Sequence, residues 1–159
     1  MHGADAPGWA HWLEASALGA WARQSSWGYA VANIVHLIGM AVLLGAVVGF
    51  DLRVIGASRA LPLAGLGRLL LPLARGGFVL AILSGVVLLS ADASHVAVNP
   101  AFQLKLGLLA AALLNVLLFH ALMRRTAGAP PGPAARGAAA LSLLLWPGVI
   151  VCGRLIAYL

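Results

Sequence analysis

Four long apolar runs divide most of the chain and limit what it can fold into. They cover approximately residues 28–50, 69–91, 102–123 and 138–159. Each run is long enough to cross about 30 Å of hydrocarbon as an α-helix. Arg75, Lys105 and Arg154 lie inside the runs but near enough to their ends for the charged groups to reach the lipid headgroups. The runs therefore predict an all-α membrane protein, an antiparallel bundle of four transmembrane helices.

The composition excludes an ordinary water-soluble domain of this length. Of the 159 residues, 62% are hydrophobic and only 9% are charged, whereas soluble domains carry about 25% charged residues. A domain this small leaves much of its surface exposed, so water could not accommodate so many apolar side chains. We therefore expect the lipid bilayer to be the main partner of the chain.

The segment before the first run has a different pattern. Trp9, Trp12 and Trp21 recur at nearly helical spacing, with polar and charged residues between them. This pattern is typical of an amphipathic helix that lies in the membrane interface with its tryptophans at headgroup level. We accordingly expect an interfacial helix within residues 1–26 and the four-helix domain over residues 27–159. A disordered tail is the alternative.

The basic residues predict the orientation. Seven arginines fall on one side of the predicted membrane: Arg53, Arg59, Arg68, Arg75, Arg124, Arg125 and Arg136. Only Arg23, Lys105 and Arg154 fall on the other side. The positive-inside rule then places the first and third connectors in the cytoplasm and both termini in the periplasm of a bacterial inner membrane. The net charge of +6 lies in short connectors without interleaved aromatic residues, so we expect no nucleic-acid partner.

His36, inside the first run, is the leading candidate for a functional residue. It lies roughly 12 Å along the predicted helix, and Asn33 precedes it by one turn on nearly the same face. An ionisable group at this depth is costly, and a neutral imidazole is the commonest metal ligand. His36 is therefore a candidate metal ligand, with Asn33 as a partner that orients it. A hydrogen bond from His36 to a neighbouring helix is the alternative.

Two further residues belong to the same predicted periplasmic layer. His95 lies in the second connector, and Lys105 begins the third run. If the connector folds back, His95 can serve as a second metal ligand and Lys105 as a cofactor-binding neighbour. The alternatives are a solvated loop histidine and an interfacial lysine anchor.

A second polar cluster is expected nearer the cytoplasm. It consists of Asp51, Arg75, Asn115 and His120. His120 should lie roughly 18 Å deeper than His36, so the two histidines should not share one metal within a chain. An Asp51–Arg75 ion pair would relieve the burial cost of both groups. The functional alternatives to this structural interpretation are a second cofactor site and a proton path.

Several motifs resemble known families. The matched features are Trp27, His36, Gly39, Asp51, Arg53, Arg75, Gly85, Asn99, Pro100, Phe102, Lys105, Asn115 and His120. Over about residues 9–123 the chain resembles a bacterial family of uncharacterised four-helix membrane proteins. More distantly, it is similar to the copper resistance D membrane domain and to the haem-linked bacterial membrane protoporphyrinogen oxidase. The last resemblance implies haem b near His36 and Lys105. The second and fourth runs contain no histidine, so the facing histidine pairs of four-span b-type cytochromes are not met within one chain.

Three functions remain open on this reasoning. The first is a redox or electron-transfer protein that holds haem b or copper near the periplasmic face. The second is a non-catalytic membrane subunit that binds a partner or lipid without a cofactor. The third is a small-solute permease with a cavity lined by Asn33, His36, Ser84 and Asn115. Small-residue faces containing Gly39, Gly45 and Gly49 also allow a homo-oligomer or packing against another membrane or redox subunit.

Overall fold

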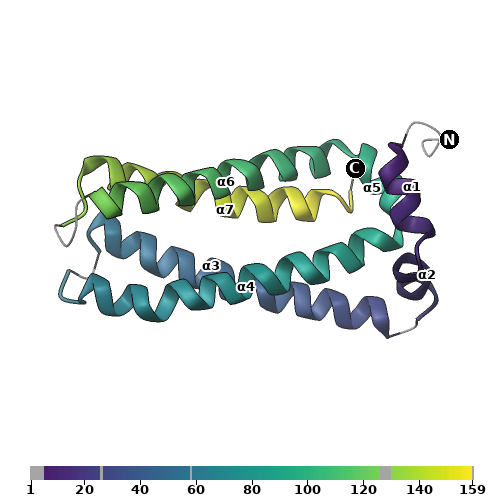
Figure 1. The fold of residues 1–159 in the computed structure, drawn as a ribbon, viewed down its shortest axis with the longest axis horizontal. Helices are drawn as coiled ribbons and strands as arrows, with labels where there is room; N and C mark the ends of the chain where they lie inside the picture. Colours follow the sequence, from purple (N-terminus) through teal and green to yellow (C-terminus); the bar gives the residue numbers. More distant parts are fainter. Residues whose placement is uncertain (1–5, 26, 58, 126–129, 159) are drawn as a thin grey trace.

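Four long helices form the body of the protein (Figure 1). The computed structural model describes residues 6–25, 27–57, 59–125 and 130–158. The long helices are α3 (Gly28–Ile55), α4 (Leu63–Ala91), α6 (Pro100–Arg125) and α7 (Pro133–Leu155). Each is long and apolar enough to cross a membrane. The prediction of an all-α, four-helix membrane protein is confirmed, and the described residues form no strand.

The helices extend beyond the apolar runs at the connector end. Helix α3 continues past Phe50 to Ile55, where Gly56 ends it with a φ of 124°. Pro62 precedes the first turn of α4, and Pro133 occupies the first turn of α7. Proline is tolerated there because a first-turn residue needs no backbone N–H bond. The apolar runs therefore indicate the thickness of the hydrocarbon rather than the length of the helices.

Helices α3 and α4 form one tightly packed hairpin. A Cβ atom at Gly39 would lie 2.8 Å from the Ala81 nitrogen, and one at Gly77 would lie 2.6 Å from the Leu43 nitrogen. Only glycine allows the two backbones to come this close. The expected small-residue contact thus occurs within the chain at Gly39, whereas nothing lies within 4 Å of a Cβ atom at Gly45.

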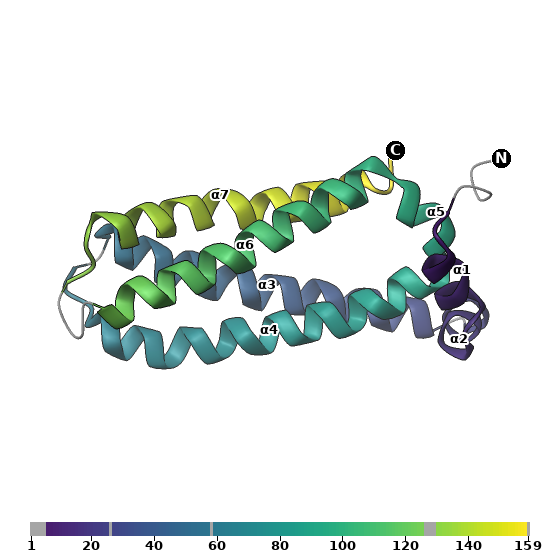
Figure 2. The ribbon, with the colours of Figure 1, turned by 45° about the horizontal axis from the view of Figure 1, so that its top comes forward.

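Helices α6 and α7 form the second hairpin, which joins the first mainly through α3 and α7 (Figure 2). Within the described residues, α4 and α6 make no close backbone contact. The helix backbones therefore lie close together along the α3–α7 side and farther apart along the α4–α6 side. We call this second side the open edge.

Three short helices cover the other end of the bundle from the connectors (Figure 1). They are α1 (Gly8–Ala15), α2 (Ala17–Gln24) and α5 (Ala93–Val98), and we call them the cap. The structure divides the expected interfacial helix in two at Ser16, which has extended backbone angles. The Ser16 hydroxyl accepts the Gly19 amide proton and so caps α2. Trp9, Trp12 and Trp21 are exposed on α1 and α2, as expected for interfacial anchors.

A carboxylate fastens α1 to the start of α5. Glu14 accepts a hydrogen bond from the Ser94 amide at 2.9 Å and a second from the Ser94 hydroxyl. Both bonds stabilise the charged form, and they hold the pKa of Glu14 below its usual value of 4.5. The α5 helix therefore receives its N-terminal cap from a residue 80 positions earlier in the chain.

Candidate functional site: a chamber with an arginine-lined mouth

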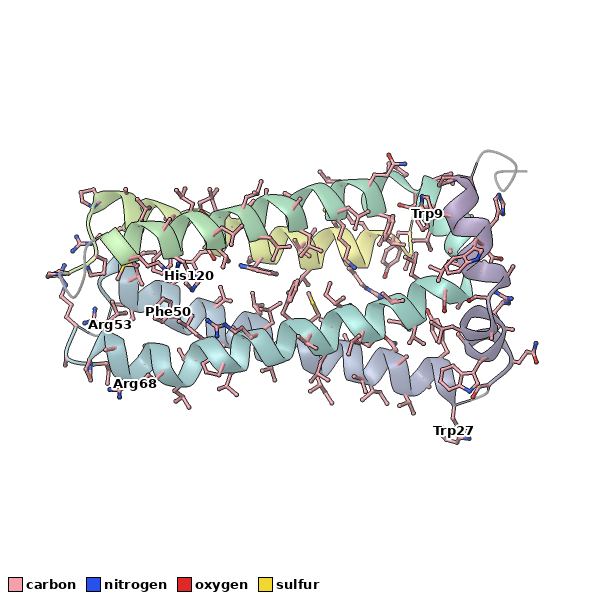
Figure 3. The ribbon with its side chains drawn as sticks, viewed as in Figure 1. Trp9, Trp27, Phe50, Arg53, Arg68 and His120 are labelled. Atoms are coloured by element: carbon pink, nitrogen blue, oxygen red, sulfur yellow. The ribbon has the colours of Figure 1, made fainter. Side chains whose placement is uncertain are left out.

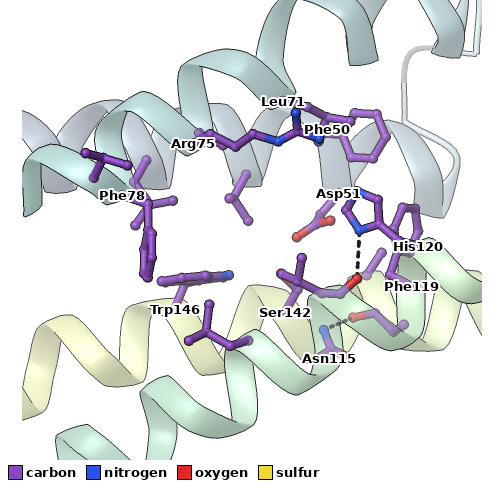
Figure 4. Close-up of a pocket in the computed structure, with 18 residues that line it drawn as sticks. Phe50, Asp51, Leu71, Arg75, Phe78, Asn115, Phe119, His120, Ser142 and Trp146 are labelled. Carbon is purple, nitrogen blue, oxygen red and sulfur yellow. Dashed lines mark hydrogen bonds between the residues drawn. The ribbon is translucent and has the colours of Figure 1, made fainter. Parts of the chain in front are cut away.

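A cavity of about 420 Å³ lies between the two hairpins, and all four long helices contribute to its wall (Figure 4). We call this cavity the chamber. Most of its lining is apolar, and its aromatic rings come from Phe50, Phe78, Phe119 and Trp146. The chamber is within the size range of ligand pockets, about 300–1,000 Å³.

Aromatic pairs join the hairpins across the chamber. Phe50 of α3 meets Phe119 of α6 edge to face, with ring centroids 5.9 Å apart. Phe78 of α4 meets Trp146 of α7 in the same geometry at 6.3 Å. Edge-to-face packing is favourable and directional. These two ring contacts connect the hairpins across the chamber, where the backbones of α4 and α6 do not meet.

Three buried polar atoms of the chamber residues lack a hydrogen-bond partner. They are Asp51 Oδ2, Asn115 Oδ1 and Trp146 Nε1, and they are the full set of such atoms among the described residues. The three side chains are only 7%, 5% and 4% exposed, respectively. Leaving one such group unpaired costs about 1–3 kcal/mol. The three atoms therefore lie around one cavity and are not scattered through the bundle.

The other polar atoms of these side chains are engaged. Asn115 Nδ2 donates to the Ala138 carbonyl at 2.9 Å and so ties α6 to α7. The Asp51 carboxyl meets the Ser142 hydroxyl of α7. The side chains are thereby fixed in position, and each keeps one atom available. Figure 4 shows Asp51 and Trp146 extending into the chamber from opposite walls.

A wider cavity of about 1030 Å³, which we call the mouth, lies next to the chamber at the connector end. The two cavities share lining residues, among them Arg75 and His120, and therefore adjoin. Five arginines line the mouth: Arg53, Arg59, Arg68, Arg75 and Arg136. No acidic residue stands among the described residues of this lining. The mouth is therefore strongly electropositive.

The mouth arginines fall into two groups. Arg53 donates from Nε to the Leu61 carbonyl at 2.7 Å and from its guanidinium to the Arg59 carbonyl at 3.3 Å, which holds the α3–α4 connector in place. Arg68, Arg75 and Arg136 are exposed and make no hydrogen bond or ion pair among the described residues. In Figure 3 Arg53 and Arg68 lie at the same end of the bundle as Phe50 and His120. The second group is therefore free to bind an anion.

The predicted second polar cluster meets at this site. Asp51, Arg75, Asn115 and His120 all line the chamber. The expected Asp51–Arg75 ion pair is not formed among the described side chains. His120 Nδ1 instead donates to the Val116 carbonyl of its own helix at 2.7 Å. Asp51 thus has no charged partner of its own.

His36 lies outside both cavities. Its Nδ1 is 2.9 Å from the Ala81 carbonyl oxygen and 3.2 Å from the Ser84 hydroxyl, so it bonds to the neighbouring helix α4. Gly85 makes room for the ring, because a Cβ atom there would lie 3.3 Å from His36 Cε1. Lys105 lies close enough to interact electrostatically with His36. The structure therefore brings together two residues of the expected periplasmic layer.

The other two residues of that layer are not gathered with His36. Asn33 is exposed on α3. His95 is 62% exposed on α5 and lies 3.6 Å from Asp92 of its own turn. In the part of the chain that the structure describes, no three His, Cys, Asp or Glu residues form a group that could hold a metal ion. The expected ligand pair of His36 and His95 has no support from these contacts.

The α7 wall of the chamber was not anticipated from the sequence. Ser142 and Trp146 are four residues apart and so lie on one helical face. A tryptophan near the middle of a membrane span, rather than in the interfacial belt, is the signal that could have found this wall. It indicates an indole N–H that must find a partner away from the headgroups.

Comparisons with protein-family models, with curated proteins and with solved structures gave no match. The arrangement of the site is therefore the basis for inferring its chemistry. The four apolar helices make the chain a multi-pass integral membrane protein.

Proposed function

We propose that this protein binds an anionic amphiphile inside the membrane. The phosphate-type head lies in the mouth, and the hydrocarbon chain lies in the chamber. The observation that carries this proposal is that an arginine-lined cavity adjoins an apolar, aromatic one. Such a pair of environments matches a molecule with one strongly anionic end and one apolar end.

The charges favour phosphate as the head. A guanidinium presents a planar fork of donors that fits a phosphate or carboxylate with two hydrogen bonds. Arg68, Arg75 and Arg136 supply three such forks without a competing acid in the described lining. Arginines placed only for topology could point to bulk lipid, but these converge on one cavity that leads into the bundle interior.

The open edge supplies a route. Because α4 and α6 make no close backbone contact in the described residues, an alkyl chain can pass between them from the bilayer. A ligand that enters from the side of the bundle keeps its alkyl chain out of water. With the connectors on the cytoplasmic side, as the positive-inside rule predicts, the ligand comes from the cytoplasmic leaflet.

Lipid retention tests this function. The full chain, purified in mild detergent and placed in zwitterionic nanodiscs, should retain the single-chain lipid dodecyl phosphate in preference to dodecylphosphocholine by native mass spectrometry. Replacing Arg68 and Arg136 together with glutamine should reduce this preference about tenfold or more, since each charge-assisted bond contributes about 1.5–3 kcal/mol. Arg23→Gln, at the cap end, is the matched control and should change nothing. Equal retention of both lipids by the unaltered protein would overturn the proposal.

A second candidate is haem b at His36, in a redox role. The supporting observation is the bond from His36 Nδ1 to the Ala81 carbonyl, because ligating histidines commonly donate their other nitrogen in this way. Lys105 is the neighbour that would stand beside the haem. The chain would hold and orient the group, which supplies electron transfer. An absorption spectrum of protein produced with added haem tests this candidate: a Soret band lost in His36→Ala supports it, and a colourless protein removes it.

A further inference from the structure

We infer that the ligand is a single-chain glycerophospholipid, with one acyl ester and one free hydroxyl next to its phosphate. This inference rests on the proposed function and narrows the class of amphiphile. It is carried by the three unpartnered polar atoms at the chamber wall, which a plain hydrocarbon chain would leave unsatisfied.

The polar atoms specify what the ligand must offer. Asp51 Oδ2 and Asn115 Oδ1 need a donor, and Trp146 Nε1 needs an acceptor. A ligand that satisfies all three therefore carries at least one hydroxyl or N–H and at least one acceptor oxygen inside the chamber. A polyprenyl phosphate has no donor or acceptor beyond its phosphate, so its chain leaves the chamber atoms unpaired.

The position of Asp51 places the donor close to the head. Asp51 and Arg75 both line the chamber, and Arg75 also lines the mouth. The group that bonds to Asp51 therefore lies only a few bonds from the phosphate. Asp51 meets Ser142 of α7, and Trp146 lies four residues beyond Ser142, about 6 Å farther along the helix, so its partner lies deeper. The order from the mouth is thus phosphate, donor, acceptor and chain.

A lysophosphatidic acid has this order of groups. Its phosphate lies at one end of the glycerol, its free hydroxyl on the next carbon, and its ester carbonyl after that. The hydroxyl donates to Asp51 or Asn115, and the carbonyl accepts from Trp146. The chamber volume of about 420 Å³ lies toward the small end of ligand pockets, which favours one hydrocarbon chain over two.

The test compares ligands that differ by one group. The full chain in zwitterionic nanodiscs is titrated with lysophosphatidic acid, its deoxy analogue without the hydroxyl, its ether analogue without the carbonyl, lysophosphatidylcholine and glycerol 3-phosphate. We expect the first to bind about tenfold more tightly than either analogue, the cost of one unpaired buried group. Glycerol 3-phosphate, which shares the head but has no chain, should not bind measurably.

Trp146→Phe provides the matched variant, because it keeps an aromatic ring and removes only the indole N–H. It should abolish the preference for ester over ether while the preference for the hydroxyl remains. Trp12→Phe, on the exposed face of α1, is the control and should preserve both preferences. Equal affinity of unaltered protein for all the single-chain phosphates would overturn this inference but leave the anionic site in place. Loss of all preference for phosphate over choline heads would instead overturn the proposed function.

Discussion

The two ends of the bundle differ in whether their polar side chains find hydrogen-bond partners. At the cap, Glu14 is bonded to Ser94, and the Asn99 side chain bonds to Ala101, Phe102 and Ile156. At the chamber, three buried atoms remain without a partner in the described chain. Polar groups that only hold the fold together are satisfied within it. The contrast supports the proposal that a ligand completes the chamber, whereas the cap holds the fold together.

The largest expected effect is on the free energy of unfolding, and it differs between two buried asparagines. Asn99→Leu should lower the free energy of unfolding by about 2–3 kcal/mol, because backbone donors at the start of α6 lose their acceptor. Asn115→Leu loses one bond but also removes an unpaired oxygen, so its cost should stay within about 1 kcal/mol. Unfolding in mixed micelles, followed by circular dichroism, measures both. Equal losses of stability in the two variants would contradict the distinction between the cap and the chamber.

A glycine in the cap tests how tightly that end is packed. A Cβ atom at Gly19 would lie 2.7 Å from the Ser90 carbonyl oxygen and would also clash with the Glu14 carbonyl. Gly19→Ala should therefore destabilise the protein by about 2 kcal/mol. Gly8→Ala is the control, since nothing lies within 4 Å of its Cβ position. A neutral Gly19→Ala variant, in the same unfolding assay, would show that α2 is not pressed against α4.

The smallest expected effect is a pH dependence of the stability of the cap. The pKa of Glu14 is lowered in the folded protein, so its contribution is complete at neutral pH and is lost as the pH falls below 4.5. Because this bond is only partly buried, the effect is limited to about 1 kcal/mol. The protection of the α5 amides against hydrogen exchange, taken relative to the intrinsic rate at each pH, should fall at low pH, and Glu14→Gln should show the lower protection at both pH values. Unchanged exchange in the variant would exclude Glu14 as the cap of α5.

The sequence predicts the helices well because their signal is local. The apolar runs define four spans without knowledge of any neighbour. Helical rise alone places Asp51, Asn115 and His120 at a similar depth, and the structure brings these residues to one chamber. The depth of a residue in the membrane can therefore be predicted from the sequence alone.

The direction in which each side chain points around its helix is less accessible, since it depends on packing. Gly39 and Gly77 fix the rotation of α3 against α4, and this contact leaves Asn33 on the exposed surface. Asp51 Oδ2 likewise lacks a partner because of which side chains the packed helices bring near it. No property of a single helix predicts that arrangement.

The open edge also determines how the affinity of this protein should be expressed. A ligand that enters between α4 and α6 arrives by diffusion in the plane of the membrane, so its supply is set by its mole fraction in the leaflet. Diluting the vesicles in buffer should not release it, whereas adding empty bilayer should. Occupancy would then follow the lipid composition of the leaflet.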